Sequence, residues 1–533
     1  MSDDIPVLVA GGSLVGLSAA LFLSIQGVPC RVVERRATTG THPRAKGFNP
    51  RTMELLRPAG VEAAVRRAEA EVIPDFARFG GLFKAESLAG RELSWIQQGT
   101  DFDRVNAAQW AVCGQHRMEP VLRERAEQLG ADIRFGTELV ALEQGSDAVT
   151  ATVREVDTGR ERRWRAGYVV AADGSRSPIR EALGCRLVGP GLRSHNLVIT
   201  FRADLERARR GRRFLICYVE QAGMRGVLMP HDRDGGWQLD IRYDPDRGER
   251  LADFTDARCV ELVRRAAGEP DLPVTIVSRL AWEADARVAE RLRWGRVLLA
   301  GDAAHVMPPT GGLGANTGMQ DAHNLAWKLA AVLGGAAGGE LLDTYDAERR
   351  PVAAFTVDQA LARYVDRVGY LNEEVAPIVE DVTLWLGCRY AAGALVAEDD
   401  DPSPCEDPRT PSGRPGGRAP HVLLERDGAL VSTHDLFGPS FALLTGPEDA
   451  GWERAAGRVG ERLGLRLAVH GIDRDVRDLD RAWCAAYAVE PTGAVLVRPD
   501  GHIAWRSRTR VERPDLALAS ALSRVLSRTV TEV

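Results

Sequence analysis

The chain has 533 residues, a length at which one hydrophobic core no longer suffices and two or three domains are expected. Its composition, 44% hydrophobic and 27% charged, is that of an ordinary globular protein. Sixty-nine basic and 75 acidic residues give a net charge of −6, which argues against broad electrostatic binding to nucleic acid. No apolar run reaches the ~18 to 20 residues that span a bilayer, so no membrane partner is expected.

The N-terminus and the cysteines indicate the compartment. The first six residues contain neither the basic nor the apolar segment of a secretory signal. The eight cysteines form no C-x-x-C pair and have no histidine at metal-ligand spacing. We therefore expect reduced thiols, a cytoplasmic location and no metal site.

The start of the chain predicts a βαβ unit. Ile5–Ala10 is a short apolar strand, and a glycine-containing turn follows at Gly11–Gly16. Leu17–Gln26 has helical apolar spacing and stops before Gly27, and Arg31–Glu34 is a second strand. This order of elements is typical of a domain that binds a dinucleotide.

The turn itself supports this interpretation. Gly11 permits the tight bend, Ser13 is small enough for backbone N–H groups to approach a pyrophosphate, and Gly16 lets the helix pack on the strand. Glu34 ends the second strand, where its carboxylate can accept hydrogen bonds from a ribose, and Arg35 lies at the edge of the site. A tight βα turn without a ligand is the alternative.

The middle of the chain predicts an antiparallel sheet. Residues 195–243 alternate with a period of two, as in Phe214–Val219 and Trp237–Tyr243. Before them, a strand runs into Asp173-Gly174, which by itself indicates a structural turn.

A second glycine-rich turn has the geometry that suits a flavin. The strand 296–300 leads into Gly301-Asp302, and the turn that follows ends at a predicted helix, Asn316–Leu333. Asp302 can accept from ribityl hydroxyls, and the backbone N–H groups of Gly314, Ala315 and Asn316 can face the pyrimidine edge. His305 is either a general base or a packed supporting residue. A further helix is predicted over 351–370.

The predicted fold is α/β: a Rossmann-like FAD-binding domain, an antiparallel-sheet substrate domain and a C-terminal third domain. The clearest linker is the Pro-, Gly- and charge-rich segment 398–420. The expected divisions are 1–185 and 281–397 for the two parts of the FAD domain, 186–280 for the substrate sheet, and 421–533 for the last domain.

The three motifs in this order resemble the FAD-dependent aromatic hydroxylases related to p-hydroxybenzoate hydroxylase, over residues 5–395. The run that begins Pro43-Arg44-Ala45 and the pair Gln115 and Glu119 look like that class as well. Gly413–Pro420, Asp435–Gly438 and Val497–Trp505 are similar to the thioredoxin-like domain of phenol and polyketide hydroxylases, and most of all to hydroxylases of aromatic polyketide antibiotics such as anthracyclines. Because the domain lacks C-x-x-C, a structural or homodimer-forming role is expected.

The resemblance implies that NADPH or NADH binds transiently and reduces FAD, and that O2 then gives a flavin C4a-hydroperoxide that hydroxylates an aromatic small molecule. It also implies a set of FAD contacts, which are Leu14, Val15, Glu34, Gln115, Leu139, Asp302 and Gly314–Asn316. Arg44, near the flavin, is the one residue given a catalytic role.

The substrate is expected between the flavin and the 195–243 sheet. Candidate contacts are Tyr218, Met229, His231 and Trp237, with the backbone carbonyl of Pro309. Plain sheet packing is the alternative for each side chain, because the sequence does not fix which face points inward.

Other functions stay open on the same scaffold. Baeyer–Villiger oxidation and oxidative inactivation of an antibiotic are not separated from hydroxylation by the sequence. Halogenation is disfavoured because the W-x-W-x-I-P run is absent. A flavin-binding regulatory protein without catalysis is the remote alternative.

Overall fold

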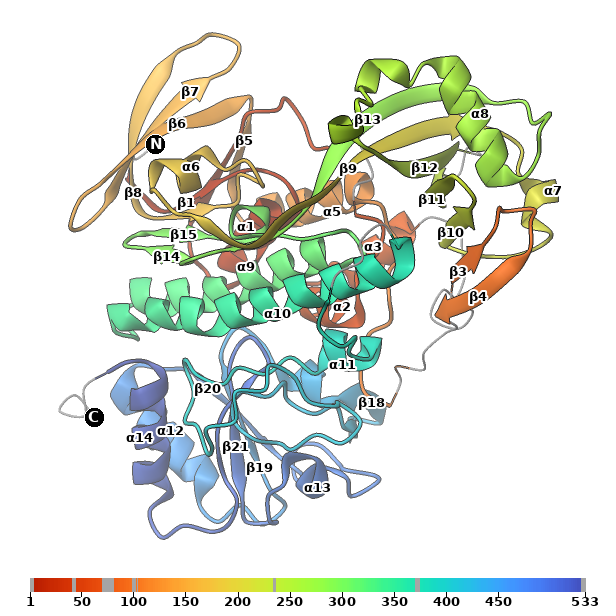
Figure 1. Cartoon of the computed structure of the whole chain (residues 1–533). Helices are drawn as coiled ribbons and strands as arrows, with labels where there is room; N and C mark the ends of the chain where they lie inside the picture. Colours follow the sequence, from red (N-terminus) through yellow and green to blue (C-terminus); the bar gives the residue numbers. More distant parts are fainter. Residues whose placement is uncertain are drawn as a thin grey trace.

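The computed structural model describes residues 4–40, 45–69, 81–97, 102, 104–232, 236–369 and 374–528. Arg44, to which the sequence gives a catalytic role, lies outside these ranges, as does Pro43. Figure 1 shows two sheets side by side in the upper half, the long helices α9 and α10 running beneath them, and the C-terminal part of the chain below these helices.

The first sheet is mainly parallel and carries the predicted βαβ unit. Its order is β14-β15-β8-β1-β2-β5, and β7 pairs with both β8 and β6. The central strand β1 is buried between β2 and β8, which is why its sequence is almost continuously apolar. The strands are β1 (Asp4–Ala10), β2 (Cys30–Glu34), β5 (Asp132–Phe135), β6 (Thr137–Gln144), β7 (Val149–Glu155), β8 (Glu161–Ala171), β14 (Arg293–Trp294) and β15 (Val297–Leu299).

The second sheet contains the antiparallel strands that the period-two pattern predicts, and it is wider than predicted. Its order is β16-β13-β9-β12-β11-β10-β3-β4. The strands β3 and β4, which the sequence did not predict, also join it, and the expected division at residue 280 falls inside β13. The strands are β3 (Leu82–Ala85), β4 (Glu92–Gln97), β9 (Leu187–Arg202), β10 (Ile216–Gln221), β11 (Met224–Asp232), β12 (Gly236–Tyr243), β13 (Thr275–Ala289) and β16 (His305–Val306).

Helices cover the two sheets and separate them from the C-terminal part. α1 packs against α9, and α8 covers one face of the second sheet while α10 contacts the strands from its other side (Figure 1). The predicted helix 316–333 is confirmed and begins three residues earlier. The helices here are α1 (Leu14–Ile25), α2 (Pro50–Leu56), α3 (Glu62–Ala68), α5 (Gln115–Gln128), α6 (Pro178–Ala182), α7 (Glu206–Arg209), α8 (Asp256–Ala267), α9 (Leu313–Leu333), α10 (Asp343–Val368) and α11 (Asp381–Leu386).

The C-terminal part has a thioredoxin-like arrangement. Its strand order is β20-β19-β21-β22, with β19 and β20 parallel and the other pairs antiparallel. α12 and α14 lie side by side against this sheet (Figure 1). The elements are the hairpin β17 (Leu423–Arg426) and β18 (Ala429–Ser432), then β19 (Phe441–Thr445), α12 (Trp452–Leu463), β20 (Leu467–Gly471), α13 (Trp483–Tyr487), β21 (Ala494–Val497), β22 (Ile503–Ser507) and α14 (Pro514–Val525).

The segment 398–420, which its composition predicts to be a linker, is packed against the residues around it. Gly417 bridges to Arg389, Arg418 bridges to His502, and the Arg418 side chain is buried. Its glycines serve close approach: a Cβ at Gly413 or Gly416 would collide with the backbone of Tyr487 or Tyr390. The glycines of this segment therefore allow close packing against neighbouring backbone.

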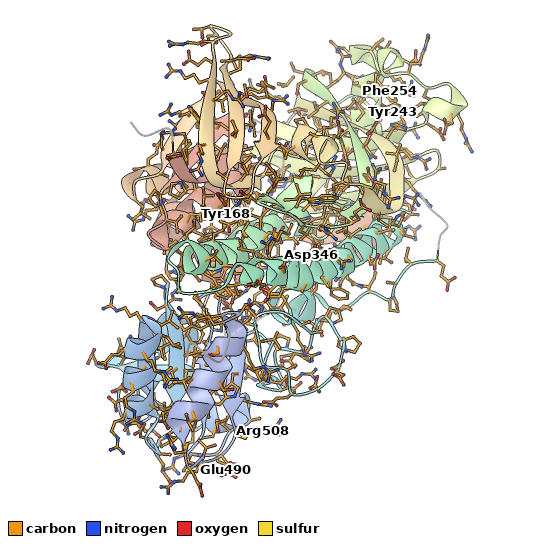
Figure 2. All side chains as sticks on the ribbon, turned by 90° about the vertical axis from the view of Figure 1, so that its left-hand side faces the viewer. Tyr168, Tyr243, Phe254, Asp346, Glu490 and Arg508 are labelled. Atoms are coloured by element: carbon orange, nitrogen blue, oxygen red, sulfur yellow. The ribbon has the colours of Figure 1, made fainter. Side chains whose placement is uncertain are left out.

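The labelled side chains in Figure 2 help to locate the second sheet, the helix α10 and the C-terminal part. Tyr243 and Phe254 meet at the outer end of the second sheet with ring centroids 5.9 Å apart, Asp346 lies on the central α10, and Glu490 and Arg508 lie at the far end of the C-terminal part. No helix in the described ranges is both long enough and apolar enough to cross a membrane.

Candidate active site

One cavity of about 550 Å³ runs from the end of β2, past the start of α1 and the start of α9, to the inner face of the second sheet. Thirteen of the residues that the sequence assigns to cofactor or substrate line it: Gly11, Ser13, Leu14, Val15, Glu34, Arg35, Gln115, Asp302, Gly314, Ala315, Tyr218, Met229 and Pro309. The structure therefore brings both predicted halves of the site to one connected space.

The end of the cavity at β2 places the carboxylate of Glu34 next to the turn that begins α1. Glu34 accepts hydrogen bonds from the Gly12 N–H at 2.8 Å and from the Arg36 backbone N–H at 2.9 Å. Burial would raise the pKa of the Glu34 carboxyl, but the hydrogen bonds from Arg36 and Gly12 outweigh it and lower the pKa. Glu34 is therefore a charged acceptor beside the turn.

The glycines of the turn act as the spacing predicts. Gly11 has a φ of 106°, and a Cβ there would collide with the carbonyl oxygen of Ala172. A Cβ at Gly16 would collide with the carbonyl oxygen of Gly11, so Gly16 supports helix packing and does not itself line the cavity.

The start of α1 leaves its backbone donors available to the cavity. Ser13 is the N-cap, but its side chain makes no capping hydrogen bond. Its Oγ instead donates to Glu119 Oε1 at 2.7 Å and accepts from Gln115 Nε2 at 2.9 Å. An uncapped helix N-terminus that faces a cavity is suited to a pyrophosphate.

The start of α9 forms the opposite wall. Gly312 is the N-cap with a φ of 65° and makes no side-chain cap, and Gly314 and Ala315 line the cavity. Asn316 points away: its side chain accepts from the Asn49 N–H at 2.9 Å and donates to the Gly312 carbonyl at 2.7 Å. It holds the wall rather than lining it.

His305 lies in a buried network beneath α9. Its Nε2 is 2.7 Å from Asp321 Oδ2, and Arg349 Nε donates to Asp321 Oδ1 at 2.7 Å. Burial would raise the pKa of Asp321, but Arg349 and His305 hold it at about 2. His305 is buried and does not line the cavity, so the geometry favours a supporting role over that of a general base.

Besides Gly16 and Asn316, the predicted cofactor contact Leu139 and the predicted substrate contacts Trp237 and His231 are absent from the cavity wall. Trp237 is on the opposite face of β12, packed with Phe214 in the core beneath α8, because successive residues of a strand alternate between faces. His231 lies beyond Met229 on β11 and does not line the cavity. Leu139 on β6 packs on the core of the first sheet instead.

The structure adds polar residues that the sequence analysis missed. The residues Lys46, Asn196, Asp240, Tyr364 and Arg367 all line the end of the cavity next to the second sheet. The sequence could have predicted that Asp240 faces away from the core. Trp237 and Leu239 form the apolar face of the same strand, and Asp240 lies on the opposite face. Asn196 lies on β9 in the same predicted sheet, and Lys46, Tyr364 and Arg367 come from distant segments that only the tertiary fold brings together.

The cavity fits FAD. Its glycines keep side chains out of the space beside β1 and β2, Glu34 and Asp302 supply acceptors, and two helix N-termini face it. Within the described part of the chain, no group of three or more His, Cys, Asp and Glu residues could hold a metal ion.

Two family models match the chain. One, described as an FAD binding domain, matches residues 4–360, and the other, described as the C-terminal part of aromatic-ring hydroxylases, matches residues 412–529. The chain belongs to the FAD-binding aromatic-ring hydroxylases. This hydroxylase is accordingly an FAD-dependent monooxygenase with the fold of that family.

Curated and solved relatives are similar over nearly the whole hydroxylase. A 4-methyl-5-nitrocatechol 5-monooxygenase of Burkholderia sp is 45% identical, covering 98% of this chain and 98% of that protein. Aklavinone 12-hydroxylase RdmE of Streptomyces purpurascens is 43% identical, covering 99% of this chain and 100% of that protein. A solved ternary complex of aklavinone-11 hydroxylase with FAD and aklavinone has a TM-score of 0.92 at 42% identity, covering 98% of this chain and 99% of that chain.

Proposed function

We propose that this hydroxylase adds one oxygen atom of O2 to a phenolic or polycyclic aromatic natural product, with NADPH or NADH as the reductant. The observation that carries the proposal is the single cavity that joins the dinucleotide turn to the inner face of the second sheet. Relatives named for a nitrocatechol and for aklavinone support an aromatic substrate that carries hydroxyl groups.

FAD, when bound, supplies the electron transfer and the activation of oxygen. The chain binds its nucleotide end at Glu34 and at the start of α1. The uncapped start of α9, with Gly314 and Ala315 in the cavity wall, would favour negative charge on a group held there.

The substrate end combines apolar surface with a few polar groups, as an orienting pocket requires. Tyr218 and Met229 present side chains from β10 and β11, and Pro309 borders the same space. Trp385 and Met307 add apolar wall that excludes water from the reacting ring. A flat aromatic ring held against this wall would face the start of α9.

The test is a substrate-dependent oxidation assay on the FAD-loaded enzyme. NADPH or NADH consumption is followed with and without a panel of phenols, nitrophenols and polyketide aglycones, and products are read by mass spectrometry. One compound should accelerate consumption and gain a single oxygen on its ring. A ring-expanded or lactone product would replace hydroxylation by Baeyer–Villiger oxidation, and no acceleration by any compound would contradict the proposal.

A further inference from the structure

Lys46 and Asp240 bring a basic and an acidic side chain to the end of the cavity next to the second sheet, from two unrelated segments. Lys46 lies in the loop before α2, and Asp240 lies on the cavity face of β12. The loop is fixed in place because Asn316 Nδ2 donates to the Gly47 carbonyl at 3.2 Å and its Oδ1 accepts from the Asn49 N–H at 2.9 Å. Both charged side chains thus have defined positions in the wall.

Each of the two groups has hydrogen-bonding capacity left over. Lys46 Nζ donates to the Pro230 carbonyl at 2.9 Å, which uses one of its three donors. Asp240 Oδ1 accepts from the indole N–H of Trp282 at 3.3 Å. Within the described part of the chain, Asp240 Oδ2 has no donor and no direct ion pair joins Asp240 to Lys46. Ligand oxygens can therefore bridge the two.

Burial makes both charges costly in the absence of a ligand. Burial lowers the pKa of the Lys46 ammonium to about 7, against the attraction of Asp240. Burial also raises the pKa of the Asp240 carboxyl to about 8, against the hydrogen bond from Trp282 and the charge of Lys46. A proton can move to or from either group near neutral pH at low cost.

We propose that Lys46 and Asp240 together bind the edge of an acidic phenol, namely a phenolic hydroxyl next to a carbonyl or nitro oxygen on the ring. Asp240 Oδ2 accepts from the hydroxyl, and the free donors of Lys46 face the phenolate oxygen and its neighbouring acceptor. This inference rests on the proposed function and specifies its substrate class.

The arrangement also activates the ring. The step starts from the state in which Asp240 is the carboxylate and Lys46 the ammonium: the O–H bond of the phenol breaks, its proton forms an O–H bond on Asp240, and the electron pair stays on the phenolate oxygen beside the Lys46 ammonium. The total charge of the site is unchanged, and no oxidant is consumed in this step. The phenolate is richer in electrons than the phenol, which favours transfer of an electrophilic oxygen to the ring. Other titratable groups facing this space are Tyr218, Tyr364, Arg367 and Asp381.

The first experiment measures binding without turnover. FAD-loaded full-length enzyme is titrated with 4-nitrocatechol and with catechol, and the visible absorbance of the nitrophenolate reports the protonation state of the bound probe. The wild type should bind 4-nitrocatechol as the anion, with a pKa below that of the free probe. Lys46→Met should weaken its binding by about 10- to 100-fold, raise the bound pKa and leave catechol affected less, because a hydrogen bond to a charged group is lost.

The second experiment separates the two residues by pH. Asp240→Asn cannot take the proton, so kcat should fall at pH values where the free phenol is protonated and recover where the phenol is already ionised. Lys46→Arg and Asp240→Glu should each restore part of the function that Lys46→Met and Asp240→Asn lose. Lys84→Met and Asp256→Asn, which change a lysine and an aspartate outside the cavity, should match the wild type.

Binding of 4-nitrocatechol by the wild type as the neutral phenol would overturn the proposal, and this outcome does not depend on any variant folding. An unchanged preference for 4-nitrocatechol over catechol in Lys46→Met, with normal FAD content, would also overturn it while leaving the proposed function intact. If the wild type hydroxylates no compound at all, the proposed function fails, and the binding spectra still decide whether the two residues hold an acidic phenol.

Discussion

The side chain of Asn316, in the first turn of α9, accepts a hydrogen bond from the backbone N–H of Asn49 at 2.9 Å. The Asn49 side chain in turn caps α2 by accepting from the Thr52 N–H at 2.9 Å. The helix start that faces the flavin end of the cavity and the loop that carries Lys46 are thus joined by a buried contact.

The substitution Asn316→Ala should remove the hydrogen bond that joins the start of α9 to the loop before α2. It leaves the buried Asn49 N–H without its acceptor, which costs about 1 to 3 kcal/mol of the free energy of unfolding. Urea denaturation of the FAD-loaded enzyme measures this loss, and FAD release should also be faster. Gln128→Ala, at an exposed position of α5, is the control; equal stability of the two variants would contradict the role given to Asn316.

Glu34→Gln should weaken FAD binding by about tenfold, because a charged acceptor beside the turn becomes neutral. The dissociation constant for FAD, measured by flavin fluorescence on the apoenzyme, checks this. Glu143→Gln changes an exposed glutamate on β6 and should bind FAD like the wild type. The assignment of Glu34 to the nucleotide end would be wrong if the two variants retained FAD equally well.

Met229 and Leu228 are neighbours on β11 that face opposite sides of the second sheet. Met229→Ala should change KM and substrate preference with a small effect on stability, because Met229 lines the cavity. Leu228→Ala should cost about 2 to 5 kcal/mol of stability, since it opens a hole in the core under α8, and leave KM nearly unchanged. Steady-state kinetics together with urea denaturation distinguish the two, and a reversed pattern would mean that the substrate binds elsewhere.

The carboxylate of Glu54, on α2, forms buried ion pairs with side chains of the C-terminal part. Arg418 Nε donates to Glu54 Oε2 at 3.1 Å, His434 Nδ1 is 3.2 Å from Oε1, and Arg51 also pairs with this carboxylate. Glu54→Gln should destabilise the protein by about 3 to 5 kcal/mol because it leaves buried arginines without their counter-charge. The control Glu62→Gln breaks half-exposed ion pairs and should cost below about 1 kcal/mol of the free energy of unfolding. Similar losses of stability in Glu54→Gln and Glu62→Gln would contradict the role given to the buried ion pairs of Glu54.

Asp321 should make the free energy of unfolding fall at acid pH. Its pKa is about 2 in the folded protein, below the ordinary value of 3.8, because Arg349 and His305 outweigh the effect of burial. A carboxyl with a lowered pKa in the folded state adds stability above its unfolded pKa, and this stability, about 2 to 3 kcal/mol, is lost as pH falls from about 4 to about 2.

Urea denaturation at a series of pH values measures this slope. Asp321→Asn should be less stable at neutral pH and show a shallower loss between about pH 4 and pH 2. An identical slope in the variant would assign the acid sensitivity to other buried carboxylates, such as Glu348, whose pKa is also about 2 because Arg498 and Lys328 outweigh burial.

The sequence predicted the parts of this hydroxylase that local rules determine. The spacing between the turn Gly11–Gly16 and Glu34 was enough to predict their arrangement, because the bend, the helix start and the end of the next strand belong to one βαβ unit. The period-two pattern likewise predicted strands between residues 195 and 243. Each prediction depends on contacts that are close along the chain.

Only the tertiary structure decided which side chains of the second sheet line the cavity. Trp237 and Asp240 both lie in β12, and their alternation along the strand places them on opposite faces, but it does not say which face another layer will cover. That choice depends on α8 and α10, which follow β12 in the chain and pack on opposite sides of the sheet.

The same reason explains why the pairs Lys46–Asp240 and Glu54–Arg418 could not be found in the sequence. Their members lie in different elements, and nothing in the local pattern couples them. Local spacing determined the glycine turn and the acid that follows it, whereas burial of distant segments against one another decided which charged groups line the cavity and which hold the C-terminal part against α2.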